Sequence, residues 1–287
     1  MISGLDLTDP ETPIGVVNRF GITTLTAEFS AGTGAGTGEL VASMPIGGMT
    51  NPFTGQPSIA GLAILVDDVA GRVNFYRTGG DQWTVSSELT VELTPDAYPS
   101  LLSEPDEPVI ASARGIGGIG SPLLSLCDLT HAGTVIGVGT VRTLPLNGGP
   151  DAPVSGGADP LIRTASTTLA DLMSVEAVSA GDGSCRLHQR PDPILNNLIG
   201  IVHGGVSGAG LELVAAAAVN LDRSEPLRTG TIRVNFLRPF AAATDRGAQS
   251  FYEGSVLRAG RNTAVADARA IGADGKVAVI ARLTAYR

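Results

Sequence analysis

The pattern of apolar and polar positions along the chain predicts one mostly apolar helix and several half-buried strands around it. Residues 204–220 are rich in Ala and Leu and contain no proline, and a run of this length suits a helix better than a strand. Residues 86–93 and 231–237 instead alternate apolar and polar side chains, which is typical of strands that are buried on one face. A helix with so little charged surface must be almost enclosed by other elements, and a curved sheet is the simplest enclosure.

The start of the predicted helix belongs to a motif that occurs twice. Residues 197–212 have a weaker copy about 145 positions earlier, at residues 58–67. In both copies an acidic residue, Asp67 or Glu212, comes nine positions after a pair of aligned residues, Ser58 and His203. One copy keeps a histidine and two glycines, and the other keeps the aspartate, so a working site assembled from both copies is expected.

Two further segment pairs keep nearly the same spacing. Residues 84–95 align with 228–239 at a spacing of 144, and residues 132–142 align with 274–284 at a spacing of 142. A period this long indicates duplication of a whole domain, because solenoid repeats recur every 20–50 residues.

The duplication divides the chain into two units. A chain of 287 residues with 43% hydrophobic residues can form two modest cores. The Pro- and Gly-rich run 146–160 has no periodicity and predicts the boundary, so the units are residues 1–150 and 151–287. Each unit should hold one long helix wrapped by a curved antiparallel sheet, with the two sheets edge to edge.

These residues carry a resemblance to a known family. Asn197 six residues before His203, the His-Gly-Gly opening, the acid nine residues after the histidine position, and the strand ending at Pro239 make the chain similar to double hotdog proteins of the PaaI-type acyl-CoA thioesterase group. The resemblance implies an α+β tandem hotdog fold. The chain departs from the family pattern in its first half, where Ser-Ile-Ala stands in place of His-Gly-Gly, and at Glu212, where an aspartate is expected.

The chemistry of thioester cleavage gives the motif a physical reason. The carbonyl oxygen becomes an oxyanion during attack, and a backbone N–H at the start of a helix is a ready donor for it. Gly204 would supply this N–H, with Gly205 beside the substrate, because a side chain would block the approach of the thioester. The resemblance adds that Asn197 orients the carbonyl and that the carboxylate, Asp67, comes from the other unit. His203 completes this predicted site, although it could serve only as a helix-entry residue bonded to backbone.

Asp67 would act as a general base on water or as a nucleophile, and the sequence leaves both routes open. Asp68 is a rival carboxylate, but the register with Glu212 favours Asp67. In relatives a hydroxyl near the start of the next strand steadies the water, and we favour Ser86 over Thr84 for this position.

The pseudo-symmetric site would place Ser58 opposite Glu212 and Thr229. Residues 58–60 lack both glycines, and no asparagine stands at the aligned position, although Asn51 is nearby. We therefore expect the second site to be degenerate.

Charge limits the partners. A net charge of -9 argues against nucleic acid or a membrane surface as a partner, since binding phosphates requires a basic stripe. Local arginines could still hold the phosphates of CoA, and the candidates are Arg238, Arg258 and Arg261.

Other motifs are weak. The Gly-rich run 115–120 fits a dinucleotide fingerprint by letters, but the residues after it predict a strand, so a hairpin is expected. The run 32–38 lacks the Lys-Ser/Thr of a phosphate loop and suits a turn. Cys127 and Cys185 form no metal-binding pattern and are expected in the core. We expect neither a metal nor an organic cofactor.

The leading hypothesis is an acyl-CoA thioesterase. Two alternatives remain open: a hydratase or dehydratase of the same fold acting on enoyl-CoA, and a non-catalytic acyl-CoA-binding module. No segment has the pattern of a signal peptide or a membrane span, so a cytoplasmic location is expected. A single chain could already hold the complete site, and further assembly into a homo-oligomer is compatible with the fold.

Overall fold

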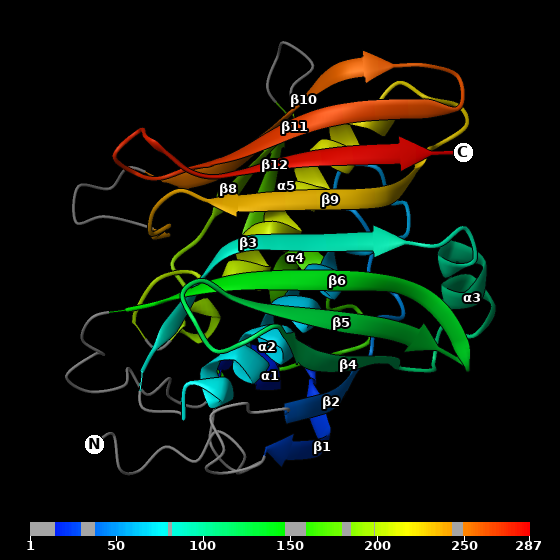
Figure 1. The fold of residues 1–287 in the computed structure, drawn as a ribbon. Coiled ribbons are helices and arrows are strands. Elements are labelled where there is room, and N and C mark those ends of the chain that lie inside the picture. Colours follow the sequence, from blue (N-terminus) through cyan, green and yellow to red (C-terminus); the bar gives the residue numbers. More distant parts are fainter. Residues whose placement is uncertain are drawn as a thin grey trace.

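A single antiparallel sheet runs through the computed structural model, with two long helices packed on one face (Figure 1). The structure describes residues 15–29, 38–79, 82–146, 159–179, 185–197, 199–242 and 249–287. Within these residues the sheet has 12 strands, and every neighbouring pair is antiparallel.

The order of the strands repeats itself about the centre of the sheet. The first half contributes, from the outer edge inward, β1 (Thr23–Phe29), β2 (Gly38–Met44), β4 (Val109–Ile116), β5 (Leu123–His131), β6 (Thr134–Pro145) and β3 (Thr84–Leu93). The second half continues, from the centre outward, with β9 (Arg228–Phe236), β12 (Val277–Tyr286), β11 (Thr263–Ile271), β10 (Ser250–Ala259), β8 (Cys185–Gln189) and β7 (Val175–Ser179). The halves meet where β3 pairs with β9, from Glu88 opposite Asn235 to Glu92 opposite Thr231. The predicted edge-to-edge arrangement of two sheets is confirmed.

The two long helices lie side by side against this sheet (Figure 1). They are α2 (Ala60–Arg77) and α5 (Gly204–Asn220), and α5 occupies the range predicted from the apolar run. Nearly all side chains of α5 are buried, as its lack of charge requires. The helix α2 has more polar side chains, yet Asp67, Asp68 and Arg72 on it are also buried.

The described residues also form short helices. They are α1 (Gly15–Phe20), α3 (Ala97–Ser103), α4 (Leu169–Leu172) and the 3-10 helix η1 (Pro193–Leu195). The helix α1 in the first half packs against η1 in the second. Arg19 of α1 is buried and forms ion pairs with Asp159 and Asp192 of the second half. Most of the predicted boundary run, residues 147–158, lies outside the described residues.

The smaller sequence predictions can be compared with the fold. The Gly-rich run 115–120 forms the end of β4 and the start of the connection to the antiparallel β5, so the expected hairpin is present. The run 32–38 lies outside the described residues except for its last glycine, which begins β2. Both cysteines are buried and unpaired, and burial raises the pKa of Cys127 to about 12 and that of Cys185 to about 11. At neutral pH they are inert thiols.

Candidate active site

Asp67 of the first half lies against the beginning of α5 in the second half. Its Oδ2 accepts a hydrogen bond of 2.6 Å from the backbone N–H of Gly205. Its Oδ1 accepts one of 2.6 Å from the Ser86 hydroxyl on β3. The side chain is 5% exposed. The positive end of the α5 dipole therefore faces a nearly buried carboxylate from the other repeat.

His203 caps the same helix. Its Nδ1 accepts a hydrogen bond of 3.1 Å from the Gly205 N–H and lies 3.4 Å from Asp67 Oδ2. The Gly205 N–H is thus shared between the histidine and the aspartate and is not free for a substrate. The sequence predicted that Gly205 lies beside the substrate. In the structure the Asp67 carboxylate covers its amide, and Gly205 does not line the cavity. Among the described residues no acceptor bonds to the N–H of Gly204, which lines the adjoining cavity.

Both glycines are required by the close approach of the two repeats. A Cβ on Gly205 would lie 2.6 Å from the Cα of Ile64 and 2.9 Å from the carbonyl oxygen of Ala63, both in α2. A Cβ on Gly204 would lie 2.7 Å from Asp67 Oδ2. Glycine at the helix entry therefore makes room for the opposing helix at one position and for the carboxylate at the other.

The site opens into a cavity of about 410 Å³. Asp67, Ser86, Asn197, His203 and Gly204 all line it, so the structure brings together the residues that the sequence grouped as catalytic. The Oδ1 of Asn197 accepts hydrogen bonds from two backbone N–H groups of its own loop, at 3.1 and 3.2 Å. This arrangement fixes the amide plane and leaves the Nδ2 group to donate to a carbonyl.

The two hydroxyls left open by the sequence lie differently. Thr84 lines the cavity, whereas Ser86 both lines it and donates to Asp67.

We expect Ser86→Ala to lower kcat/KM for the expected thioester hydrolysis about tenfold. A charge-assisted hydrogen bond contributes about 1.5–3 kcal/mol, and a water molecule in place of the hydroxyl restores part of this energy. Thr84→Val is the matched control and should change kcat/KM less than threefold. Equal effects of the two substitutions would contradict the assignment to Ser86.

The rival carboxylate has another partner. Asp68 forms an ion pair of 2.8 Å with Arg72, one turn further along α2, and does not bond to α5.

The apolar wall of the cavity contains aromatic side chains that the sequence analysis did not assign, namely Phe75, Trp83, Phe236 and Phe240. Phe75 could have been found from the spacing, since it follows Asp67 by two helical turns on one face. Trp83 follows the end of α2 and had no such signal.

The three candidate arginines differ in their position relative to the cavity. Arg238 lines the cavity, donates to the carbonyl oxygen of Val277 and pairs with Asp274. Arg258 and Arg261 do not line it. The carbonyl of Arg261 accepts from Arg223, just past the C-terminal end of α5, whereas the cavity lies at the N-terminal end, about 25 Å away along the helix. The prediction that these two arginines contact the same ligand as Asp67 is not supported by their positions.

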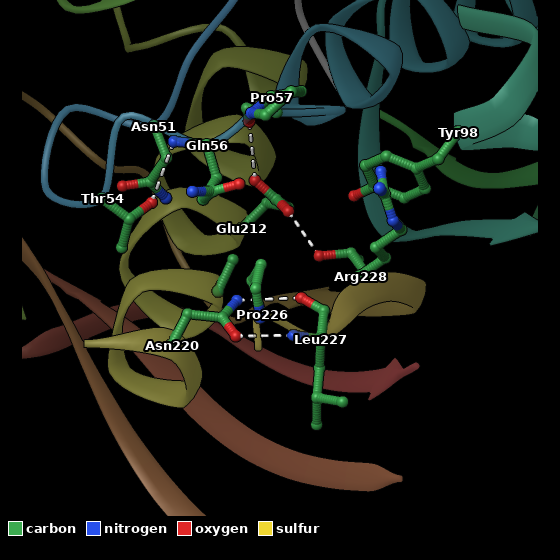
Figure 2. Close-up of a pocket in the computed structure, with 13 residues that line it drawn as sticks. Asn51, Thr54, Gln56, Pro57, Tyr98, Glu212, Asn220, Pro226, Leu227 and Arg228 are labelled. Atoms are coloured by element: carbon green, nitrogen blue, oxygen red, sulfur yellow. Dashed lines mark hydrogen bonds between the residues drawn. The ribbon is translucent and has the colours of Figure 1, made fainter. Parts of the chain in front are cut away.

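The pseudo-symmetric position holds a buried counterpart of the site (Figure 2). Glu212 of α5 accepts hydrogen bonds from Ser58 at 3.1 Å and from Thr229 at 2.6 Å, so the three residues predicted for this site do meet. The space beside them is only about 30 Å³, which is room for about one water molecule. Tyr98 lies beside Glu212 and under the guanidinium of Arg228, 4.8 Å from ring centre to carbon.

An asparagine equivalent to Asn197 is present in this second site. The Oδ1 of Asn51 accepts from the N–H two residues later, as Asn197 does, and both asparagines open a similar backbone turn. Asn51 stands seven residues before Ser58, one more than separates Asn197 from His203, and this extra residue hid the match in the sequence. The Nδ2 of Asn51 donates to the carbonyl oxygen of Leu213, so α5 engages the amide nitrogen that in Asn197 faces the cavity.

Burial of Glu212 leads to a prediction about stability. Desolvation raises the pKa of this carboxyl above its ordinary value, against the opposing effect of the Thr229 and Ser58 hydroxyls. An acid with a raised folded-state pKa makes the protein less stable as pH rises from its unfolded pKa, about 4.3, to the folded value. Glu212→Gln removes this loss. Its free energy of unfolding relative to the parent protein should therefore increase with pH, by about 1.4 kcal/mol for each unit of pKa elevation, and its Tm relative to the parent should rise accordingly. Thermal unfolding of both proteins from pH 4.5 to 8.5 tests this, and a Tm difference independent of pH would contradict it.

The comparisons with known proteins agree with this architecture. The family model for the thioesterase superfamily matches residues 199–279, which include the start of α5 and the strands after it. No curated protein matches the chain.

Solved structures extend the likeness to the whole chain. The tesB protein from Mycobacterium avium subspecies paratuberculosis is 10% identical, covers 96% of this chain and 98% of its own length, and has a TM-score of 0.57. A protein from Novosphingobium aromaticivorans named as a thioesterase is 11% identical, with coverages of 90% and 97% and a TM-score of 0.53. A phenylacetic acid degradation-related protein from Ralstonia eutropha is 24% identical over 41% of this chain and 88% of its own, with a TM-score of 0.37. The two likenesses that span the chain show that it has the double hotdog fold, so the predicted fold is confirmed. The PaaI subtype stays a prediction.

In the described part of the chain, no three His, Cys, Asp or Glu side chains gather in a way that could hold a metal ion. None of the described helices has both the length and the apolar character that crossing a membrane demands.

Proposed function

We propose that this protein hydrolyses acyl-CoA thioesters in the cavity beside Asp67. The observation that carries the proposal is the carboxylate of α2 held at the N-terminus of α5, at the wall of a cavity of about 410 Å³. The match of the second half to the thioesterase superfamily supports the same reaction class.

The carbonyl oxygen of the thioester is polarised by two donors. The N–H of Gly204 has no acceptor among the described residues, and the Asn197 Nδ2 is the part of that amide not used within its loop. Both line the cavity, and the dipole of α5 adds to their effect on the developing oxyanion. His203 acts indirectly, since its Nδ1 fixes the first turn of the helix by accepting from Gly205.

Asp67 supplies the attacking group by one of two routes. As a general base it takes a proton from water, whose oxygen bonds to the carbonyl carbon, and the proton passes to the departing CoA sulfur when the carbon–sulfur bond breaks. As a nucleophile it bonds to the carbonyl carbon itself, CoA leaves, and water then cleaves the anhydride. In either route Ser86 holds the carboxylate oxygen and can turn its hydroxyl toward the water.

Arg238 is the cation at the cavity suited to the CoA side. Its side chain is 29% exposed, and Asp274 and a backbone carbonyl hold it in place. In a chain with a net charge of -9, such a local cation is needed beside phosphates.

The test is release of free thiol from short, medium, long and aromatic acyl-CoAs, followed with a thiol reagent. Hydrolysis of at least one class is expected. Tight binding of acyl-CoA with no thiol release would contradict the proposal and favour the binding module. Loss of the double bond of an enoyl-CoA without thiol release would favour a hydratase.

A further inference from the structure

One wall of the cavity carries two charged side chains that have no role in the proposed thioester hydrolysis. Asp68 and Arg72 both line the cavity, and they are 5% and 9% exposed. They lie on α2 beyond Asp67, whereas the donors for the carbonyl lie on and before α5. The pair neither touches the N-terminus of α5 nor contributes to the proposed oxyanion site.

The pair keeps unused hydrogen-bonding capacity. Arg72 donates from Nη2 to Asp68 Oδ2 at 2.8 Å and from Nη1 to the Thr24 hydroxyl at 3.1 Å. A guanidinium has five N–H groups, so these two bonds leave three; the Nε–H is buried, and the other two are on the terminal nitrogens. The second oxygen of Asp68, Oδ1, accepts from no group among the described residues. One wall thus offers both donors and an acceptor.

The other repeat shows that the fold does not need this pair. At the spacing of 145 that relates Asp67 to Glu212, Asp68 corresponds to Leu213 and Arg72 to Ala217. Both of these are fully buried on α5. A buried ion pair is often no more stabilising than apolar residues of similar volume, so packing alone does not account for Asp68 and Arg72. The pair occurs only on α2, whose residues 67–75 line the cavity over two turns, whereas α5 reaches the cavity only at its first turn.

We propose that Asp68 and Arg72 select an acyl group that carries a hydroxyl. This inference rests on the proposed function. A hydroxyl both donates, to Asp68, and accepts, from Arg72. A carboxylate on the acyl group would instead be repelled by Asp67 and Asp68, and in the described part of this wall Arg72 already pairs with Asp68.

The position of the pair sets where on the acyl group the hydroxyl lies. Arg72 follows Asp67 by five residues, so it lies about 8 Å from Asp67 along the helix axis. Phe75 and Trp83, whose rings stack at 5.2 Å, line the cavity beyond it and would contact the apolar remainder of the acyl group. The CoA moiety lies on the side of the partly exposed Arg238.

The experiment compares matched acyl-CoAs that differ in one oxygen. Thiol release is measured for straight-chain acyl-CoAs and for the same chains with a hydroxyl at each carbon from the third to the sixth. For the best hydroxyl position, kcat/KM of the parent protein should exceed that of the unsubstituted chain by at least about tenfold, since polar groups left unpaired in a site disfavour the analogue that lacks the hydroxyl. The double variant D68L/R72A, which installs the residues of the other repeat, should reduce this ratio to about one.

The outcomes separate the two proposals. Hydrolysis with no hydroxyl preference in the parent protein would overturn this inference and leave the thioesterase proposal in place. A uniform loss on all substrates in D68L/R72A would also overturn it, because the pair would then act on CoA or on Asp67. Absence of thiol release from every thioester would overturn the proposed function and this inference with it. If D68L/R72A does not fold, the single variant Arg72→Met and the ratio in the parent protein still decide the question.

Discussion

Asp67→Asn should lower kcat/KM for acyl-CoA hydrolysis by at least about 10³-fold while the protein still folds and binds acyl-CoA. Loss of a general base alone reduces rates about 10²–10⁴-fold, and loss of a nucleophile reduces them further. The fold should persist, because the asparagine Oδ1 can still accept from Gly205 and its Nδ2 can donate to the Ser86 oxygen. Thiol release measures the rate, calorimetric titration with acyl-CoA measures affinity, and thermal unfolding measures stability.

The internal repeat provides the matched control for this substitution. Glu212 holds the equivalent place on α5, with hydroxyl partners of its own, but beside a space for about one water. Glu212→Gln should therefore leave kcat/KM within about twofold of the parent value. If Asp67→Asn retained more than a tenth of the parent activity, or if Glu212→Gln abolished it, the assignment of a single working site to Asp67 would be wrong.

The fold was predictable because its signal extends over long segments. The apolar run 204–220 and the segment pairs near a spacing of 144 residues are set by burial, and burial acts on every residue of a helix or strand. The same register placed Asp67 opposite the start of α5, where the structure has it. A site that takes its carboxylate from the other half could be inferred because the two copies of the motif retain different chemical groups.

Contacts that depend on side-chain reach were not predictable in the same way. Arg258 and Arg261 were chosen for their charge, and charge does not tell on which end of α5 an arginine lies. The ion pair of Asp68 with Arg72 is an i,i+4 pair visible in the sequence, but only the structure shows that it faces the cavity. Asn51 escaped the alignment because a single extra loop residue shifted it, while the hydrogen bonds of its turn remained the same.

The second large effect is expected for Gly205→Ala, which should destabilise the protein by about 1–3 kcal/mol or more. The new methyl group would lie 2.6 Å from the Cα of Ile64 and 2.9 Å from the carbonyl oxygen of Ala63, so the backbones of α2 and α5 would have to separate. The gain in helix propensity, at most about 1 kcal/mol, does not offset this. Thermal unfolding should show a Tm lower by several degrees, and thiol release should fall because Asp67 loses its place at the helix N-terminus.

Substitutions at two other glycines are the controls for the backbone clash at Gly205. Gly71→Ala on α2 meets nothing within 4 Å and should raise stability, by up to about 1 kcal/mol. Gly204→Ala meets the end of the Asp67 side chain, 2.7 Å away, and this carboxylate can rotate, so activity should fall with little change in Tm. A Gly205→Ala protein as stable as the parent would mean that the helices can separate without cost. The close approach of the two repeats, which brings Asp67 to the first turn of α5, would then not be what makes glycine necessary there.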